Sequence, residues 1–198
     1  MRASPAIRGD STLSQKADAL QSVERKTRAW LSEFVVGLNL CPFARPLLAS
    51  DALRVTVCEA TAEEGVAIAL LDELGRLETA SETEIATTLV VFPNALKRFE
   101  DYLAFLNGAE QLLEEMSLVG VLQLASFHPD YLFAGEPIDA ASHYTNRAPF
   151  PMIHLLREAM ITRALETFPN PEKIPERNIQ TLEDLGRERI HQMLASLV

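Results

Sequence analysis

"LRVTVCEATAEEGVAIALLDELGRLETASETEIATTLVVF" (residues 53–92) contains three hydrophobic patterns in succession. Side chains alternate along 53–58, with Leu53, Val55 and Val57 on one side, which is the period of a half-buried strand. The middle carries an apolar helical stripe, and Thr61 with Glu64 predicts a capping box at its start. Residues 86–92 form a β-branched run that predicts a second strand. Strand, helix and strand in this order indicate a parallel crossover unit.

The pattern continues toward the C-terminus. Asn94 is placed to cap a second helix, and "NG" at Asn107 and Gly108 predicts a break or kink in it. Residues 119–127, "VGVLQLASF", predict a third strand that is buried on both faces. We therefore expect an α/β fold with a small three- or four-stranded sheet and crossover helices. The alternative is a ferredoxin-like α+β sheet, if "DYLFAG" (130–135) adds an antiparallel strand.

Helices are expected on both sides of this unit. An apolar stripe predicts a helix from Gln15 to Val36, and "GLNLCPFARP" (37–46) ends it, because Gly37 and Asn39 tolerate left-handed conformations and the prolines prevent continuation. Two further helices are expected at about 151–167 and 176–196. Residues 1–14 are rich in serine and small residues and predict a disordered lead-in. Residues 15–198 then form a single domain.

Composition excludes several classes of partner and compartment. The chain has 198 residues and a formal net charge of −10 at pH 7. An acidic surface repels phosphate, so we expect no nucleic-acid or membrane partner. There are two cysteines and no pattern of a disulfide framework. The N-terminus lacks the apolar core of a signal peptide, and no apolar run is long enough to span a bilayer. These features predict a soluble cytoplasmic protein.

The candidate chemistry lies in a long loop at about 127–151, rich in Pro, His, Tyr and Asn. The loop begins at the end of the third strand, and ligands in open α/β sheets bind beyond such strand ends. His128 comes first, with Pro129 favouring an extended backbone before it, and is a candidate general base or metal ligand. The alternative is a histidine that holds the strand end by hydrogen bonds to backbone groups.

Two more groups follow along the chain. Asn146 and Arg147 are candidates for substrate binding, because the planar fork of arginine suits a carboxylate or phosphate; equally, both side chains could hold the loop by their own hydrogen bonds. In the helix expected from Pro151, His154, Arg157 and Glu158 fall at i, i+3 and i+4 and would share one polar face. That face would close a pocket, or it is an ordinary solvated helix face.

Cys41 is the third catalytic candidate beside His128 and His154. It follows a helix C-terminus, whose negative dipole end disfavours the thiolate, so a reactive Cys41 would need a nearby histidine or arginine. We expect it to be a half-buried wall residue of a pocket whose working groups lie about a hundred residues later. The alternative is a buried plug at the chain reversal, if Cys41 lies far from His128 and Arg147. A composite site of Cys41, His128 and His154 is conceivable, but no zinc motif is present, and Cys-Pro is a weak signal for haem. The sequence contains no nucleotide-binding or serine-hydrolase motif.

Four motifs in order carry a family resemblance: "GLNLCPFA", "FHPDYLFA", "YTNRAPFPMIHLLRE" and "PERNIQTLEDLG". Over about Trp30 to Gly186 the chain resembles an uncharacterised bacterial family, domain of unknown function 1415. The resemblance implies that the family's motif positions include Tyr131, a further substrate-binding candidate. The other implied positions are Cys41, Pro42, His128, Pro129, Asn146, Arg147, Pro149, Pro151, His154, Arg157 and Glu158. The chain departs from the expected pattern at His143, Ala148 and Phe150, which weakens a mechanism that needs a hydroxyl at 148 or 150.

Three functions remain open. The favoured one is an enzyme acting on a small anionic metabolite by hydrolysis or group transfer, with Arg147 and Arg157 anchoring the anion and His128 as general base. The second is a non-catalytic metal- or haem-binding protein that uses Cys41 and the histidines. The third is an adaptor that dimerises through the terminal helix. An apolar stripe on such a helix more often packs into the protein's own core. The stripe comprises Ile179, Leu182, Leu185 and Ile190. Substrate, cofactor and oligomeric state do not follow from the sequence.

Overall fold

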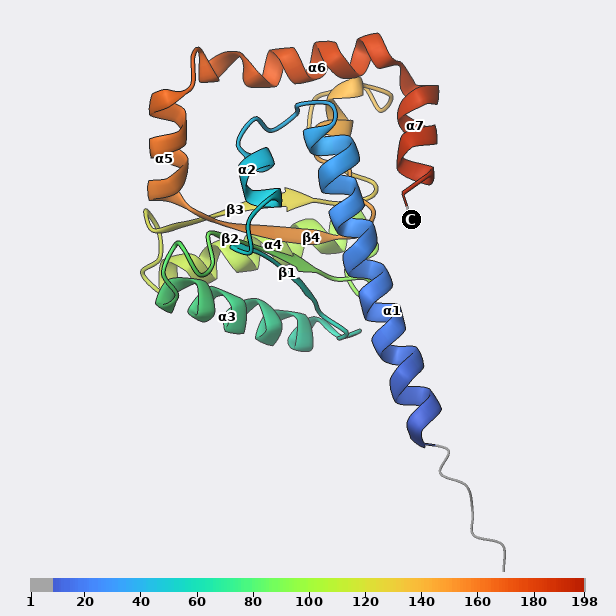
Figure 1. The fold of residues 1–198 in the computed structure, drawn as a ribbon, viewed down its shortest axis with the longest axis vertical. Helices are drawn as coiled ribbons and strands as arrows, with labels where there is room; N and C mark the ends of the chain where they lie inside the picture. Colours follow the sequence, from blue (N-terminus) through green and yellow to red (C-terminus); the bar gives the residue numbers. More distant parts are fainter. Residues whose placement is uncertain (1–8, 198) are drawn as a thin grey trace, which may run out of the picture.

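A four-stranded mixed sheet lies at the centre of the computed structural model, which describes residues 9–197 (Figure 1). The strands are β1 (Leu53–Val57), β2 (Thr87–Val91), β3 (Leu122–Phe127) and β4 (Met152–Arg157), in the spatial order β1-β2-β4-β3. β1 and β2 pair in parallel, and β4 is antiparallel to both of its neighbours. β1, β2 and β3 therefore run in the same direction, and the expected α/β fold with crossover helices is confirmed.

The antiparallel strand is β4, where the sequence predicted the start of a helix at 151–167. That prediction is wrong for residues 152–157, and the helix α5 covers only Glu158–Thr167. Residues 130–135, the segment on which the ferredoxin-like alternative depended, contain no strand. β4 lies between two strands and is largely buried, and such a strand is an apolar run that periodicity does not distinguish from a buried helix.

Helices cover both faces of the sheet. The crossover helices α3 (Glu63–Thr79) and α4 (Phe99–Glu115) lie on one face, which we name the α3–α4 face. The opposite face, the η1 face, is covered by the N-terminal and C-terminal elements, and in Figure 1 α5, α6 and α7 frame the short α2 above the sheet. These elements are α1 (Gly9–Ala29), the π-helix η1 (Trp30–Val36), α2 (Ala44–Leu48), α6 (Ile174–Leu185) and α7 (Arg187–Ala195).

Side chains of each strand alternate between two apolar cores. Val90 and Ile153 belong to the core on the α3–α4 face. Leu89 and Met152 belong to the core on the η1 face. The register pairs Leu89 and Ala125 with His154, so His154 lies on the η1 face in the middle of the sheet. Neighbours along a strand point to opposite faces, which decides where each candidate side chain goes.

Several local predictions require correction. α3 begins after Ala62 without a side-chain cap, so the capping box of Thr61 and Glu64 does not form. α4 begins after Arg98 and runs without a break through Asn107 and Gly108. β3 is an edge strand that is mostly half-buried, rather than buried on both faces. The terminal helix expected at 176–196 is divided at Gly186, whose φ of 75° interrupts the helical backbone.

The N-terminal helix is longer than expected at its start. α1 begins at Gly9, within the expected lead-in, and residues 1–8 lie outside the described part of the chain. In the described part, no helix is both long and apolar enough to cross a membrane. In the terminal stripe, Leu182 and Ile190 are fully buried in the protein's own core.

The helix end at 37–39 has a different cause from the one expected for glycine. Asn39 takes the left-handed conformation, with a φ of 53°, as predicted. Gly37 is right-handed, with a φ of −59°, but a Cβ there would lie 2.0 Å from the carbonyl oxygen of Glu33. Glycine is therefore required at 37 because the backbone of η1 approaches it closely.

Candidate functional site

An apolar groove of about 540 Å³ lies over the η1 face of the sheet. All four strands contribute to its floor, which includes Thr87, Leu89, Ala125 and His154. Its roof is made by the segment Cys41–Leu48 and by Met160, Ile161 and Ala164 of α5. Its size falls in the range of small-molecule pockets, and an apolar lining with a few polar groups is typical of them.

His154 is the most unusual polar side chain in the groove. Thr87 Oγ1 donates to the carbonyl oxygen of Leu155 at 2.6 Å, so the contact of 2.6 Å between Thr87 Oγ1 and His154 Nε2 has the imidazole as donor. The proton is thereby fixed on Nε2, and Nδ1 remains an acceptor. Burial lowers the pKa of His154 to about 4, so the ring is neutral at physiological pH.

Cys41 lines the same groove as His154. Burial raises the pKa of its thiol, with opposing hydrogen bonds from the backbone of Phe43 and Ala44 as smaller effects. The thiol is thus protonated near pH 7, which agrees with the expectation from the helix-end dipole. Cys41 and His154 face one groove as a thiol and a neutral imidazole.

A second cavity, the polar cavity, has a volume of about 630 Å³ and adjoins the groove at Cys41 and Phe127, which line both. Asn146, Thr145 and Ser142 of the long loop contribute to its wall. Across from the loop, the wall is completed by α6 and its N-terminal end, with Pro175, Asn178 and Ile179.

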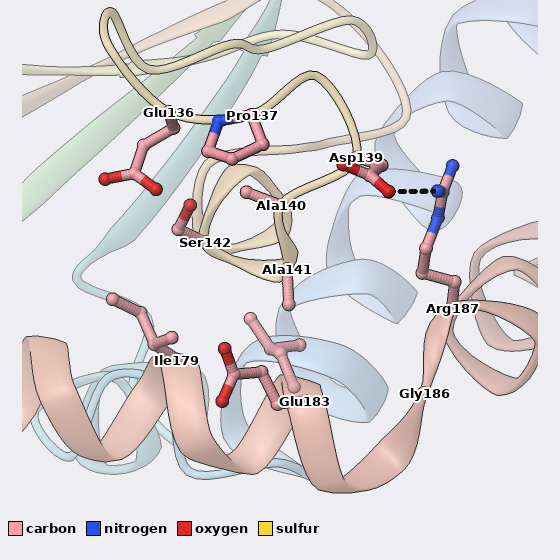
Figure 2. Close-up of a pocket in the computed structure, with 11 residues that line it drawn as sticks. Glu136, Pro137, Asp139, Ala140, Ala141, Ser142, Ile179, Glu183, Gly186 and Arg187 are labelled. Atoms are coloured by element: carbon pink, nitrogen blue, oxygen red, sulfur yellow. Dashed lines mark ion pairs between the residues drawn. The ribbon is translucent and has the colours of Figure 1, made fainter.

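A third cavity, the outer cavity, has a volume of about 450 Å³ and lies between the loop 136–142 and the α6–α7 corner (Figure 2). It shares Glu136, Ser142 and Ile179 with the polar cavity. Asp139 and Arg187 form an ion pair of 3.7 Å at its edge, and Figure 2 shows the carboxylate of Glu183 between α6 and the loop.

His128 is buried and lines none of these cavities. Its Nδ1 accepts from the backbone N–H of Asp130 at 3.0 Å, so Nε2 carries the proton and donates to Leu96 at 3.0 Å. Burial lowers the pKa of the ring. Both nitrogens are occupied by the backbone, which corresponds to the alternative of a histidine that holds the strand end rather than a general base.

The other loop candidates are largely occupied in the same way. Asn146 donates to the carbonyl oxygen of Ser126 at 3.0 Å, and Arg147 Nε donates to that of Tyr131 at 3.2 Å. The guanidinium of Arg147 lies 4.4 Å from the centre of the Tyr144 ring. The backbone carbonyl oxygen of Arg147 accepts a hydrogen bond from the indole N–H of Trp30. Of these side chains, Asn146 alone lines one of the three cavities described above.

Arg157 lies on the α3–α4 face, away from the groove. It donates to the carbonyl oxygens of Leu77, Ala80 and Ile85 at 2.7–3.1 Å, and so caps the C-terminal end of α3. Because residues 152–157 are a strand, His154 and Arg157 project to opposite faces of the sheet. The predicted helix face of His154, Arg157 and Glu158 is therefore wrong.

The structure thus brings Cys41 together with His154 in the groove, and with Asn146 in the polar cavity. His128, Tyr131, Arg147 and Arg157 line neither, so the composite set of Cys41, His128 and His154 is not formed. Among the side chains of residues 14–197, no cluster of three or more His, Cys, Asp or Glu is placed to hold a metal ion.

Several lining residues were missed from the sequence. Thr87 and Gln123 are polar positions within apolar strands, and Asn178 lies in the "PERN" motif. The motif was the only available signal, because nothing in the sequence says that α6 lies against the turn at 39–41.

Comparison with protein families gives a match over residues 22–192 to a model described as "Protein of unknown function (DUF1415)". Comparison with curated proteins and with solved structures gave no match. The matched range contains the whole sheet and all residues that line the groove. The chain therefore belongs to the DUF1415 family, as its four motifs predicted.

Proposed function

We propose that the protein binds a small, uncharged and largely apolar molecule in the groove. The observation that carries the proposal is the groove itself: all four strands and the Cys41–Leu48 segment enclose about 540 Å³ that the protein's own side chains leave unfilled. Hydrophobic burial would supply the affinity. The acceptor Nδ1 of His154, which has no hydrogen-bond partner in the described part of the chain, would orient a donor on the ligand.

An uncharged ligand is favoured over the anionic metabolite expected from the sequence. No lysine or arginine of residues 14–197 lines the groove or the polar cavity. Arg147 and Arg157, the expected anion anchors, donate to backbone carbonyl oxygens instead. A buried anion without a cationic partner is costly, so an anionic ligand finds little support here.

A fluorescence titration tests the proposal. Trp30 is the only tryptophan, is 1% exposed, and packs edge-to-face on Phe127 in the groove wall at 5.2 Å between ring centres. We expect the neutral apolar probe N-phenyl-1-naphthylamine to change Trp30 emission and to gain fluorescence on binding.

Matched variants of α5 locate the binding. Ala164→Phe places a ring in the groove and is expected to weaken probe binding at least about tenfold, since it removes apolar contact area. Ala159→Phe adds the same ring at an exposed position of α5 outside the groove and should leave binding unchanged. Equal binding by the wild type and Ala164→Phe, with both folded, would contradict the proposal.

A second candidate, catalysis by the Cys41 thiol, is supported by the presence of Cys41 and His154 in one groove. The protonated thiol and neutral imidazole make it the weaker of the two, because an activated nucleophile needs the thiolate. Hydrolysis of p-nitrophenyl butyrate by the wild type that is lost in both Cys41→Ser and His154→Gln would favour it.

The cytoplasmic location predicted from the sequence stays a proposal. It is supported by the free thiols of Cys41 and Cys58.

A further inference from the structure

The polar cavity and the outer cavity meet along one wall of the long loop. Glu136 and Ser142 from the loop and Ile179 from α6 line both of them. Neither cavity contains His154, and the outer cavity shares no residue with the groove; the polar cavity adjoins the groove at Cys41 and Phe127.

The charges around the two cavities do not balance. Three carboxylates line the outer cavity, those of Glu136, Asp139 and Glu183, against one cation, Arg187. Asp139 forms the ion pair with Arg187. Glu136 and Glu183 are exposed and form no ion pair with any side chain of residues 14–197, and Glu136 also faces the polar cavity. Two exposed carboxylates without a cationic partner among these residues therefore line the outer cavity, one on the loop and one on α6.

The wall of the polar cavity adds two buried polar atoms without partners: a serine hydroxyl, which can accept or donate, and an amide oxygen, which only accepts. Ser142 Oγ and Asn178 Oδ1 are buried and have no hydrogen-bond partner among the described residues, and each side chain is 8% exposed. The amide nitrogen of Asn178 donates to Leu40, which fixes Oδ1 as the oxygen that lacks a donor. Leaving a buried acceptor without a donor is unfavourable, so Asn178 Oδ1 would be stabilised by a donor on a ligand.

We propose that these two cavities form a binding site for a small primary amine in its ammonium form. An ammonium group supplies the cationic partner that Glu136 and Glu183 do not have within the protein. Its three N–H donors suit acceptors such as Ser142 Oγ. The two carboxylates favour a diamine over a monoamine. The site is independent of the apolar ligand proposed for the groove, and each proposal can fail without the other.

Calorimetric titration of the full chain with 1,4-diaminobutane at low ionic strength tests the inference. Two probes separate charge from hydrogen bonding: 1,4-butanediol has donors and no charge, and tetramethylammonium has the charge and no N–H donor. The diamine is expected to bind at least about tenfold more tightly than either. Its affinity should fall as salt is added, because screening weakens exposed charge pairs.

Three variants assign the site to its residues. Ser142→Ala removes a hydroxyl that makes no hydrogen bond in the described chain, so it should fold normally and weaken diamine binding several-fold. Glu136→Gln and Glu183→Gln should each weaken it about tenfold. Glu115→Gln removes the same charge from α4, on the other side of the sheet, and should leave binding unchanged.

The inference is overturned if the diol binds as tightly as the diamine, or if tetramethylammonium does. It is also overturned if Ser142→Ala retains wild-type affinity, or if Glu115→Gln weakens binding as much as Glu136→Gln. Binding of N-phenyl-1-naphthylamine in the groove is unaffected by these outcomes, so the two sites are tested separately.

Discussion

The side-chain amide of Asn178 in α6 donates a hydrogen bond of 2.6 Å to the backbone carbonyl oxygen of Leu40, the residue before Cys41. Next to it, Arg177 donates to the carbonyl oxygen of Asn39 at 2.9 Å. These contacts join positions 138 residues apart. Through them α6 holds the turn from which the roof of the groove begins.

Asn178→Ala should loosen this turn. Leu40 is buried, so its carbonyl oxygen loses its donor without access to water, and we expect a loss of about 1–3 kcal/mol in the free energy of unfolding. Urea denaturation measures this loss. Mass spectrometry should show faster alkylation of Cys41 by iodoacetamide. Arg177→Ala, whose contact is exposed, should cost less than about 1 kcal/mol. An unchanged alkylation rate in Asn178→Ala would argue against a positioning role.

Gly37→Ala and Gly75→Ala should have opposite effects. A Cβ at 37 would lie 2.0 Å from the Glu33 carbonyl oxygen, so the end of η1 must shift, and we expect a loss of about 2–4 kcal/mol. A Cβ at 75, inside α3, meets nothing within 4 Å, and alanine should stabilise the helix by about 0.5–1 kcal/mol. Thermal unfolding monitored by circular dichroism measures both. A tolerated Gly37→Ala would mean that the close approach is not structurally required.

His154 should make the protein less stable in mild acid. Its pKa is about 4 in the folded chain and about 6.5 when unfolded, so protons bind the unfolded chain more readily between these values. The stability is therefore fully present above about pH 6.5 and falls as the pH drops toward 4, by up to about 3 kcal/mol.

Urea denaturation of the wild type and of His154→Gln between pH 4 and pH 8 tests this dependence. The variant should lose most of the slope between pH 6.5 and pH 4. Some slope should remain, because burial also lowers the pKa of His128. Parallel curves for the two proteins would show that His154 is not held neutral by burial.

Arg157→Met should destabilise the protein without affecting the groove. The carbonyl oxygens of Leu77, Ala80 and Ile85 would lose their donors, and we expect a loss of about 3 kcal/mol. Arg157→Lys should recover only part of it, since lysine lacks the planar fork. Arg163→Met breaks an exposed pair with Glu82 and should cost under about 1 kcal/mol. Wild-type stability in Arg157→Met, measured by thermal unfolding, would return Arg157 to the list of ligand-binding candidates.

Local patterns were sufficient for most of the fold. The alternation at 53–57 and the β-branched run at 87–91 are set by the period of the strand itself, and both strands form where expected. The left-handed Asn39 at the end of the N-terminal helix follows from local rules in the same way, whereas the early start of that helix and the close approach at Gly37 do not. β4 was missed because Met152–Arg157 is an apolar run after a proline, and its partners β2 and β3 lie far away in sequence.

The candidate site could be predicted only in part, because it depends on contacts between distant segments. Cys41 was expected to line a pocket with groups about a hundred residues later; His154 and Asn146 are such groups, but His128 and Arg147, on which the prediction depended, line neither cavity. His128 and Arg157 are polar residues at the places where backbone groups need partners, and a sequence does not distinguish this use from ligand binding. Which carbonyl oxygen an arginine reaches is decided by the tertiary structure.

The position of β4 in the sheet has a consequence for synthesis on the ribosome. β3 pairs only with β4, so once residues 122–127 have been made they have no sheet partner until residues 152–157 follow. Until then β2 also presents an unpaired edge, and such edges promote aggregation. The nascent chain must extend past Arg157 before the sheet can close, so folding is expected to depend on protection of this edge during translation.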